Sequence, residues 1–174
     1  MYRCRVIKNH SVTKTSLRCL AFTLAAMLSA PAFGATTTST FQSQITIAAS
    51  CTILSATTLD FGSQGVLTAN VDQTNTIQVQ CTNSTPYNIG LDAGTGAGAT
   101  VTSRKMTSGG VTVNYFLYSN AGRTTNWGNT VGTDTVSSAG TGASQSFTVY
   151  GRVPSQTTPA PATYTDTITV TVTY

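Results

Sequence analysis

The sequence predicts an all-β domain. Three observations support this prediction: threonine is unusually frequent, apolar and polar residues alternate along short segments, and glycine, asparagine and proline cluster between those segments. Of the 140 residues from Ala35 to Tyr174, 33 are threonine, and a β-branched side chain suits the exposed face of a strand. No segment shows the apolar period of an amphipathic helix over a useful length.

The last eleven residues, 164–174, show the alternation most clearly. Every odd position is threonine, and the even positions are Tyr, Asp, Ile, Val, Val and Tyr. Such strict alternation is typical of a strand with one buried face. Asp166 interrupts the apolar face near the start of this strand, where we expect a turn to satisfy its carboxylate.

Weaker alternation predicts the remaining strands. In chain order these are 41–53, 77–81, 87–91, a short piece at 101–106 that pairs locally, 111–117 and 147–153. Clusters of Gly, Asn, Ser and Pro, which favour turns and loops, separate them at 62–65, 92–98, 108–110, 120–142 and 154–161. About seven short strands divided by turns predict an immunoglobulin-like β-sandwich in a single domain, with a β-barrel as the alternative.

Residues 1–34 have the three parts of a cleaved secretory signal peptide. Five of the nine basic residues lie in the first 18 positions, an apolar run follows at 20–28, and small residues precede Ala35. The apolar run is shorter than the about 20 residues that a membrane-spanning helix needs. We therefore predict cleavage after Gly34, with Ala30-Pro31-Ala32 as a competing site and a buried core helix as the alternative interpretation.

Removing this leader changes the charge of the chain. The full sequence has a net charge of +4, but residues 35–174 hold four cationic and five anionic side chains, a net charge of −1. Nucleic-acid binding needs clustered Lys and Arg side chains. The sequence therefore gives no support for a nucleic-acid partner.

Two cysteines, Cys51 and Cys81, follow the leader. In an exported chain an even number of cysteines predicts a disulfide, and this one should stabilise the fold by about 3–4 kcal/mol in the chain-entropy model. Two free thiols or a metal site are the alternatives. Two cysteines with no histidine do not complete a tetrahedral zinc site, so we expect neither a metal nor another cofactor.

Catalysis has little support. The only histidine, His10, lies in the leader, so a Ser–His or Cys–His nucleophile is not available to the exported domain. A pair of carboxylates, as in glycosidases, is the remaining option. The candidates are Asp60, Asp72, Asp92, Asp134 and Asp166. An aspartate at the end of a strand more often forms a turn, and we therefore expect no enzymatic activity.

From residue 40 to the end, the order and spacing of short motifs resemble the spore coat protein U-like family, the subunits of archaic chaperone–usher pili. No single motif is specific. They are Cys51, Leu59-Asp60-Phe61-Gly62, Val79-Gln80-Cys81, Ile89-Gly90-Leu91-Asp92-Ala93-Gly94, Arg104-Lys105-Met106, Tyr115-Phe116-Leu117-Tyr118, Trp127-Gly128, Val149-Tyr150-Gly151-Arg152-Val153-Pro154, Tyr164-Thr165-Asp166-Thr167 and the terminal Tyr174.

The resemblance implies an immunoglobulin-like sandwich that lacks one edge strand and is completed by a donor strand. A periplasmic chaperone first lends this strand, and at an outer-membrane usher the N-terminal extension of the next subunit replaces it. Main-chain hydrogen bonds give such strand addition its affinity, and alternate side chains give it its register. The implied partners are the chaperone, the usher and neighbouring subunits of a homo- or hetero-polymer. The implied location is a pilus on the cell surface, with roles in adhesion and biofilm formation.

By position, residues 35–47 are the expected donor segment and residues 48–174 the pilin-like domain. Phe41, Ser43, Ile45 and Ile47 share one parity, so that their side chains would enter the neighbour together. Residues 35–40 depart from the family's pattern because they are few and polar, which implies a shorter donor strand. In the alternative interpretation, 41–53 is simply the first strand of this domain.

The C-terminal strand is the expected wall of the acceptor groove. Its apolar face consists of Ile168, Val170, Val172 and Tyr174. An alternative function for the same fold is a surface-binding adhesin or a spore or cell coat component. In that case Trp127 and Tyr118, which we expect on exposed loops, would contact the sugar or surface.

Overall fold

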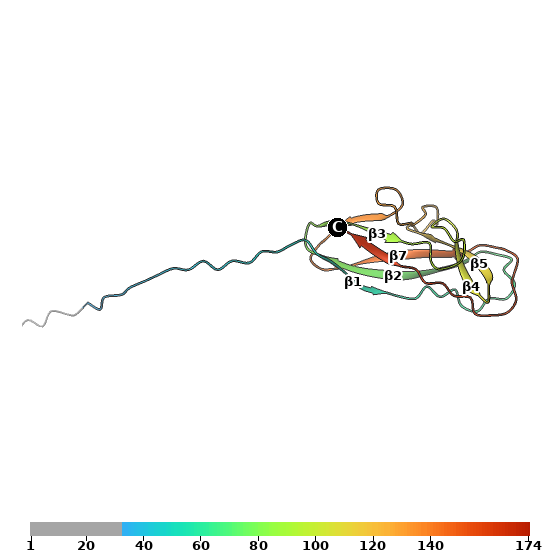
Figure 1. Ribbon diagram of the computed structural model, residues 1–174, viewed down its shortest axis with the longest axis horizontal. Coiled ribbons are helices and arrows are strands. Elements are labelled where there is room, and N and C mark those ends of the chain that lie inside the picture. The colour runs from blue at the N-terminus through green and yellow to red at the C-terminus, as the bar shows by residue number, and fades with distance from the viewer. Residues whose placement is uncertain (1–32) are drawn as a thin grey trace, which may run out of the picture. The chain divides into compact units, whose positions relative to one another are not determined.

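The computed structural model describes residues 33–174, so the expected leader lies outside the described residues except for its last two positions. The described residues form eight β-strands and no helix (Figure 1), which confirms the all-β class. None of the described segments is a helix long and apolar enough to cross a membrane. Two units are distinguished, one ending at Ser43 and one spanning Gln44–Tyr174, and all eight strands belong to the second.

The strands form two antiparallel sheets. The strands are β1 (Cys51–Ala56), β2 (Val71–Cys81), β3 (Pro86–Leu91), β4 (Arg104–Ser108), β5 (Val111–Tyr118), β6 (Val136–Ala139), β7 (Ser144–Val153) and β8 (Val170–Thr173). The larger sheet has the order β1-β2-β7-β5-β4 and the smaller sheet the order β6-β3-β8. This arrangement is the immunoglobulin-like sandwich that the sequence predicts.

The core lies between the two sheets and is built from alternating apolar side chains. On β5, for example, Val113, Tyr115 and Leu117 are buried, whereas the alternate residues Asn114, Phe116 and Tyr118 are half-exposed. The other strands contribute Ile77 and Val79 from β2, Ile89 and Leu91 from β3, and Val149 and Val153 from β7. Burial of each such side chain contributes about 1.5–3 kcal/mol, so the alternation that predicts the strands also accounts for their packing.

The expected strand at 41–53 is wrong in its first ten residues. Residues 33–50 have no regular secondary structure, and β1 starts at Cys51. The register explains this start, because Cys51 pairs with Cys81, the last residue of β2. Beyond this pair only Ser50 is still bonded, to Thr82, and residues 33–49 make no backbone hydrogen bond to the residues that follow β2.

The C-terminal strand also forms ladder hydrogen bonds over fewer residues than the alternation predicts. The ladder covers only β8, whose first residue, Val170, pairs with Leu91, the last residue of β3. Residues 164–172 nevertheless keep the expected pattern, with even positions half-buried and odd positions exposed. The sequence correctly predicts which side chains face the core, because that pattern does not depend on a complete ladder.

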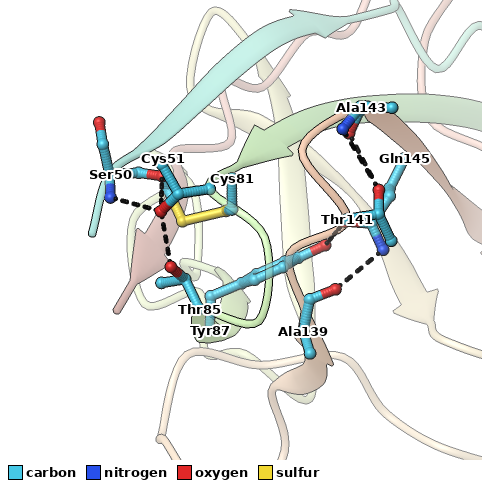
Figure 2. The surroundings of a disulfide bond; sticks show 10 residues. Ser50, Cys51, Cys81, Thr85, Tyr87, Ala139, Thr141, Ala143 and Gln145 are labelled. Atoms are coloured by element: carbon cyan, nitrogen blue, oxygen red, sulfur yellow. Dashed lines mark hydrogen bonds between the residues drawn. A yellow bond between two sulfur atoms is a disulfide. The ribbon is translucent and has the colours of Figure 1, made fainter. Parts of the chain in front are cut away.

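A disulfide and several hydrogen bonds join the start of β1 to the end of β2 (Figure 2). The predicted disulfide between Cys51 and Cys81 is confirmed. Beside it, the Ser50 N–H donates to Thr82 Oγ1 at 3.0 Å, and the Thr82 N–H donates to the Ser50 carbonyl at 2.9 Å. Thr82 Oγ1 is also within 2.6 Å of Thr85 Oγ1. The chain therefore enters the domain at a fixed point.

Candidate functional site

The larger sheet ends in the edge strand β1 and the smaller sheet in the edge strand β8, and these two edge strands lie near each other. Among the described residues, β1 is paired only with β2 and β8 only with β3. Cα atoms of β1 and β8 approach within 8 Å of each other, but the two strands do not pair. The unpaired N–H and C=O groups of an edge strand are a template for another strand.

A cleft of about 1100 Å³ opens between the segment that follows β1 and the segment that leads into β8. Residues 56–67, which continue from β1, line one side, and residues of the segment 158–170, which leads into β8, line the other. Its floor consists of core side chains: Ile77, Leu91, Val113, Tyr115, Leu117, Val149 and Val153. An extended segment with apolar side chains on one face matches such a cleft, because the floor is apolar and backbone partners are available at its sides.

The structure places the four expected wall residues differently from one another. Ile168 and Val170 line the cleft. Val172 packs against the core outside the lining, and the Tyr174 side chain is 60% exposed. Only the first two therefore lie where an inserted segment would touch them.

Asp166 anchors the segment 158–170, which forms one wall of the cleft. Its carboxylate accepts hydrogen bonds from the Thr95 N–H at 2.7 Å, from Thr95 Oγ1 at 2.9 Å and from the Tyr115 hydroxyl at 2.7 Å. Burial and the bond to Asp166 raise the pKa of Tyr115, which therefore stays a neutral donor. Thr95 belongs to the glycine-rich loop 92–98, and the neighbouring Thr167 N–H donates to the same carboxylate at 2.8 Å.

Gly94 allows this loop to approach Asp166. Its φ of +78° lies in the left-handed region, and a Cβ there would collide with the Asp166 carboxylate. Glycine adopts such a conformation without the steric cost that other residues incur. The Asp92-Ala93-Gly94 motif is therefore explained by packing against the cleft wall.

Arg104 lies in the core next to the start of this loop, where its guanidinium bonds the Asp92 carbonyl. Its side chain is completely buried, and burial lowers the pKa of its guanidinium. Its three nitrogens donate at 2.7–2.9 Å to four backbone carbonyls, those of Leu91, Asp92, Val101 and Trp127. This role was not predicted, since a basic residue in a strand is normally assigned to the surface.

Trp127 corrects a sequence prediction. We expected an exposed contact residue on a loop, but the side chain is only 1% exposed and its Nε1 donates to the Ile89 carbonyl at 2.8 Å. Tyr118 lies on β5, not on a loop, and is half-exposed beside Phe116 at a ring distance of 6.2 Å. The two aromatic residues therefore do not form a common exposed surface.

The expected donor residues lie outside every strand. The side chains of Phe41, Ile45 and Ile47 are exposed by 93%, 82% and 73%, and Ser43 is exposed as well. Three of these four exposed side chains are apolar, and in the sequence all four precede Ser50.

The five aspartates have structural partners. Asp60 accepts from the Gly62 N–H, Asp134 from the Thr130 N–H, and Asp92 from the N–H groups of Gly94 and Thr169. Asp72 accepts two hydrogen bonds from Arg152, at 2.7 and 2.8 Å, and the bond to Arg152 is the main reason that the pKa of Asp72 is lowered. In the part of the chain that the structure describes, no three His, Cys, Asp or Glu side chains gather as a metal site would require.

Comparisons with known proteins agree with this architecture. The family model of the Spore Coat Protein U domain matches residues 37–171. The chain is 34% identical over 171 residues to Protein U of Myxococcus xanthus, covering 88% of this chain and 95% of that protein.

Among solved structures, the chain is similar in fold to a chain of the CsuC–CsuE chaperone–tip adhesion subunit pre-assembly complex from the archaic chaperone–usher Csu pili of Acinetobacter baumannii. The TM-score is 0.54 at 24% sequence identity, and the match covers 74% of this chain and 40% of that chain. The chain thus spans less than half of the length of that structure's chain.

Proposed function

We propose that this chain, which belongs to the Spore Coat Protein U domain family, is a structural subunit of a surface pilus and polymerises by donor-strand exchange. The cleft with an apolar floor between the segment after β1 and the segment before β8, next to the open edges of these two strands, carries this proposal. A segment inserted there would pair with backbone at the sides of the cleft and pack its apolar side chains over the core side chains of the floor. Such strand addition is a head-to-tail contact that does not close on itself, so it builds a fibre.

Residues 35–47 are the proposed donor segment and residues 48–174 the acceptor domain. Phe41, Ser43, Ile45 and Ile47 are exposed and share one parity. In an extended strand they would all point into the cleft. The length of this series suits a short donor strand of about seven residues, which lies within the range usual for strands.

The entry point of the chain favours donation to a neighbour over folding back. The N–H and C=O of Ser50 are both bonded to Thr82. To return along β1, the chain would have to reverse direction within Ala48 and Ala49. Two-residue hairpin turns need at least one residue with positive φ and therefore favour glycine and asparagine. Two alanines disfavour this reversal.

Before assembly, the open cleft requires a temporary occupant. We propose that a periplasmic chaperone fills it after the leader, residues 1–34, has directed export, and that an outer-membrane usher exchanges the chaperone for the tail of the next subunit. The similar solved structure is itself a complex of a chaperone with a pilus subunit, which supports the first of these partners. The fibre, a homo- or hetero-polymer, would then act in adhesion and biofilm formation at the cell surface.

Deletion of residues 35–47 tests the proposal. The wild-type chain should give a ladder of species in unheated SDS gels that collapses on boiling, because strand-exchanged subunits resist the detergent. The deleted chain should give no ladder but should still bind the chaperone. Deletion of residues 35–39, which removes no apolar anchor, is the matched control and should keep the ladder. A ladder from the chain without 35–47 would show that the donor lies elsewhere.

A coat component of the same fold remains the second candidate, because the name of the matched family refers to a spore coat. It predicts a closed layer rather than separate fibres, and electron microscopy of the assembled protein distinguishes the two. An adhesin is less well supported, since Trp127 is buried. The structural partners of the five aspartates likewise give no support to an enzyme.

A further inference from the structure

The larger sheet has a further open edge, on the side of β7 that faces β5. β7 pairs with β2 over all of Ser144–Val153, but it pairs with β5 only at Tyr150, Gly151 and Arg152. Among the described residues, the part of β7 before Tyr150 therefore has a neighbouring strand on one side only. This edge is separate from the cleft, because β2 lies between β7 and β1.

The strand register shows which backbone groups this edge leaves open. The Thr57 N–H donates to the Thr76 carbonyl, so the even residues of β2 face β1 with their backbone groups. The backbone groups of successive strand residues point to opposite sides, so the odd residues of β2 face β7. Odd residues of β2 lie opposite odd residues of β7, as Ile77 lies opposite Phe147. The N–H and C=O groups of the even residues of β7 therefore point away from β2.

The even residues on the open part of β7 are Ser144, Ser146 and Thr148, and all three are exposed. β5 ends before it reaches Ser146 and Thr148, and no backbone hydrogen bond of the loops among the described residues reaches them. A hollow of about 180 Å³ lies beside these two residues, and its lining includes the half-buried Val136 and Phe147. A strand added here would pair with backbone and also shield apolar side chains from water.

The open edge of β7 lacks the usual protection against strand addition. Natural edge strands are protected by charged side chains, prolines, bulges or a covering segment. Residues 135–151 contain neither a charged residue nor a proline. β4, the last strand of the same sheet, is by contrast covered, because both backbone groups of Thr107 bond to Thr165. The open edge of β7 is therefore available to another strand.

We propose that this edge is a contact between two copies of this chain, in which the two β7 strands pair antiparallel about Ser146. A second copy suits the edge because residues 135–151 are uncharged, so that no like charges meet when identical strands face each other. Pairing about Ser146 aligns Ser144 of each copy with Thr148 of the other. The free backbone groups of all three even residues then find partners in one isologous contact.

The neighbouring strand limits how far this pairing extends. Tyr150 is already paired with Tyr118 of β5, so a second copy cannot pair beyond Val149. A strand pair centred on Ser146 stays within this limit, because Ser144 of the second copy reaches Thr148 and the turn before Ser144 then leads its chain away. The geometry therefore favours this register over one shifted toward Tyr150.

The contact uses neither the cleft nor the tail, residues 35–47, so it does not depend on donor-strand exchange. In a fibre built by strand exchange, it would join subunits of two neighbouring fibres side by side. It thus assigns to this chain a second way of associating with its own copies.

The substitution Ser146→Cys tests the register directly. Opposite residues of a hydrogen-bonded antiparallel pair have Cα atoms about 5.5 Å apart, a separation that a disulfide spans. We expect mild oxidation to give a covalent dimer that survives boiling in SDS and disappears on reduction. Thr74→Cys is the matched control, because Thr74 is also exposed but lies on β2, which is paired on both sides. Equal dimer yields from the two variants would overturn the proposal.

Charges at Ser146 provide a second test. Ser146→Lys places like charges opposite each other and should abolish side-by-side association, measured as the fraction of assembled protein that low-speed centrifugation sediments. Ser146→Asp should have the same effect, and an equal mixture of the two variants should restore sedimentation, because opposite charges then meet. Thr74→Lys and Thr74→Asp are the controls and should sediment like the wild type. Wild-type sedimentation of Ser146→Lys alone, or no recovery in the mixture, would contradict the contact.

The SDS ladder separates this contact from the proposed function. Ser146→Lys should leave the ladder of unheated samples intact, because the ladder reports strand exchange at the cleft. If the wild-type chain gives no ladder but Ser146→Cys gives its dimer, the proposed function fails and the contact stands. If the ladder forms but the Ser146→Cys dimer does not, the contact fails and the proposed function stands.

Discussion

Arg104 donates a 2.8 Å hydrogen bond from its guanidinium to the carbonyl oxygen of Trp127, and neither side chain reaches solvent. The same guanidinium also donates hydrogen bonds to three other carbonyls, and the indole N–H of Trp127 donates to a carbonyl of β3. The two residues thereby join β3, β4 and the loop after β5. Because β8 pairs only with β3 among the described strands, one side of the cleft depends on this junction.

Replacing Arg104 should be severely destabilising. Arg104→Met leaves four carbonyls without their donor, and we expect the free energy of unfolding to fall by at least about 3 kcal/mol. Arg104→Lys should not rescue the loss, because one ammonium group cannot reproduce the planar fork of a guanidinium. Urea unfolding of the purified protein measures both. Arg152→Met, which breaks an exposed pair with Asp72, is the control and should cost less than about 1 kcal/mol.

Removing the disulfide should loosen β1. Replacing Cys51 and Cys81 by alanine should lower the free energy of unfolding by about 3–4 kcal/mol. Because β1 is an edge strand held otherwise only by β2, its amides should then exchange with deuterium faster than those of β5. Reduction of the wild-type protein is the control and should give the same loss. Unchanged protection of β1 in both would contradict this assignment.

The stability should fall at acidic pH in part through Asp92. Burial raises the pKa of this carboxyl, but hydrogen bonds from Thr169 and Gly94 and the charge of Arg104 outweigh it, so that the pKa lies below its ordinary value of 3.8. A lowered pKa stabilises the fold above the unfolded value, and this contribution is lost as the pH falls through the folded value.

We therefore expect the free energy of unfolding to decrease as the pH drops below about 4, and Asp92→Asn to flatten this decrease. Chemical unfolding between pH 7 and pH 2.5 provides the measurement. Identical slopes for the wild type and the variant below pH 4 would count against this role of Asp92.

Gly94→Ala should damage the wall of the cleft. A Cβ at this position collides with the carboxylate of Asp166, so the loop from 92 to 98 must move away from the wall. Gly132 is a matched control, because its φ of +79° is nearly that of Gly94 at +78° and a Cβ there would have no neighbour within 4 Å.

Both alanine variants incur the cost of a left-handed backbone, about 1–2 kcal/mol. Only Gly94→Ala should in addition accelerate the release of subunits from the assembled protein. Equal release rates for the two variants would show that the wall tolerates displacement of the loop.

The sequence predicted those features that depend on local alternation. The inward faces of β5 and of residues 164–172 follow from parity alone, and the disulfide follows from the number of cysteines. β6 was expected to be part of a loop, because its four residues contain a single large apolar side chain, Val136. Such a short edge strand gives no periodic signal.

The missed residues depend on contacts between distant segments. Arg104 is buried because four carbonyls from three different segments accept hydrogen bonds from it. No local sequence pattern predicts such a site. Trp127 follows β5 in a stretch rich in glycine and asparagine, so it was placed on the surface.

The fastening of Cys51 to Cys81 also determines how the domain would bear mechanical load. In the proposed fibre, tension on the tail enters the domain at Ser50 and reaches Cys51 first. The disulfide then passes the force through covalent bonds to β2, which is paired on both sides, with β1 and with β7. Tension therefore does not pull β1 away from β2. The contact between subunits, rather than the subunit itself, should yield first.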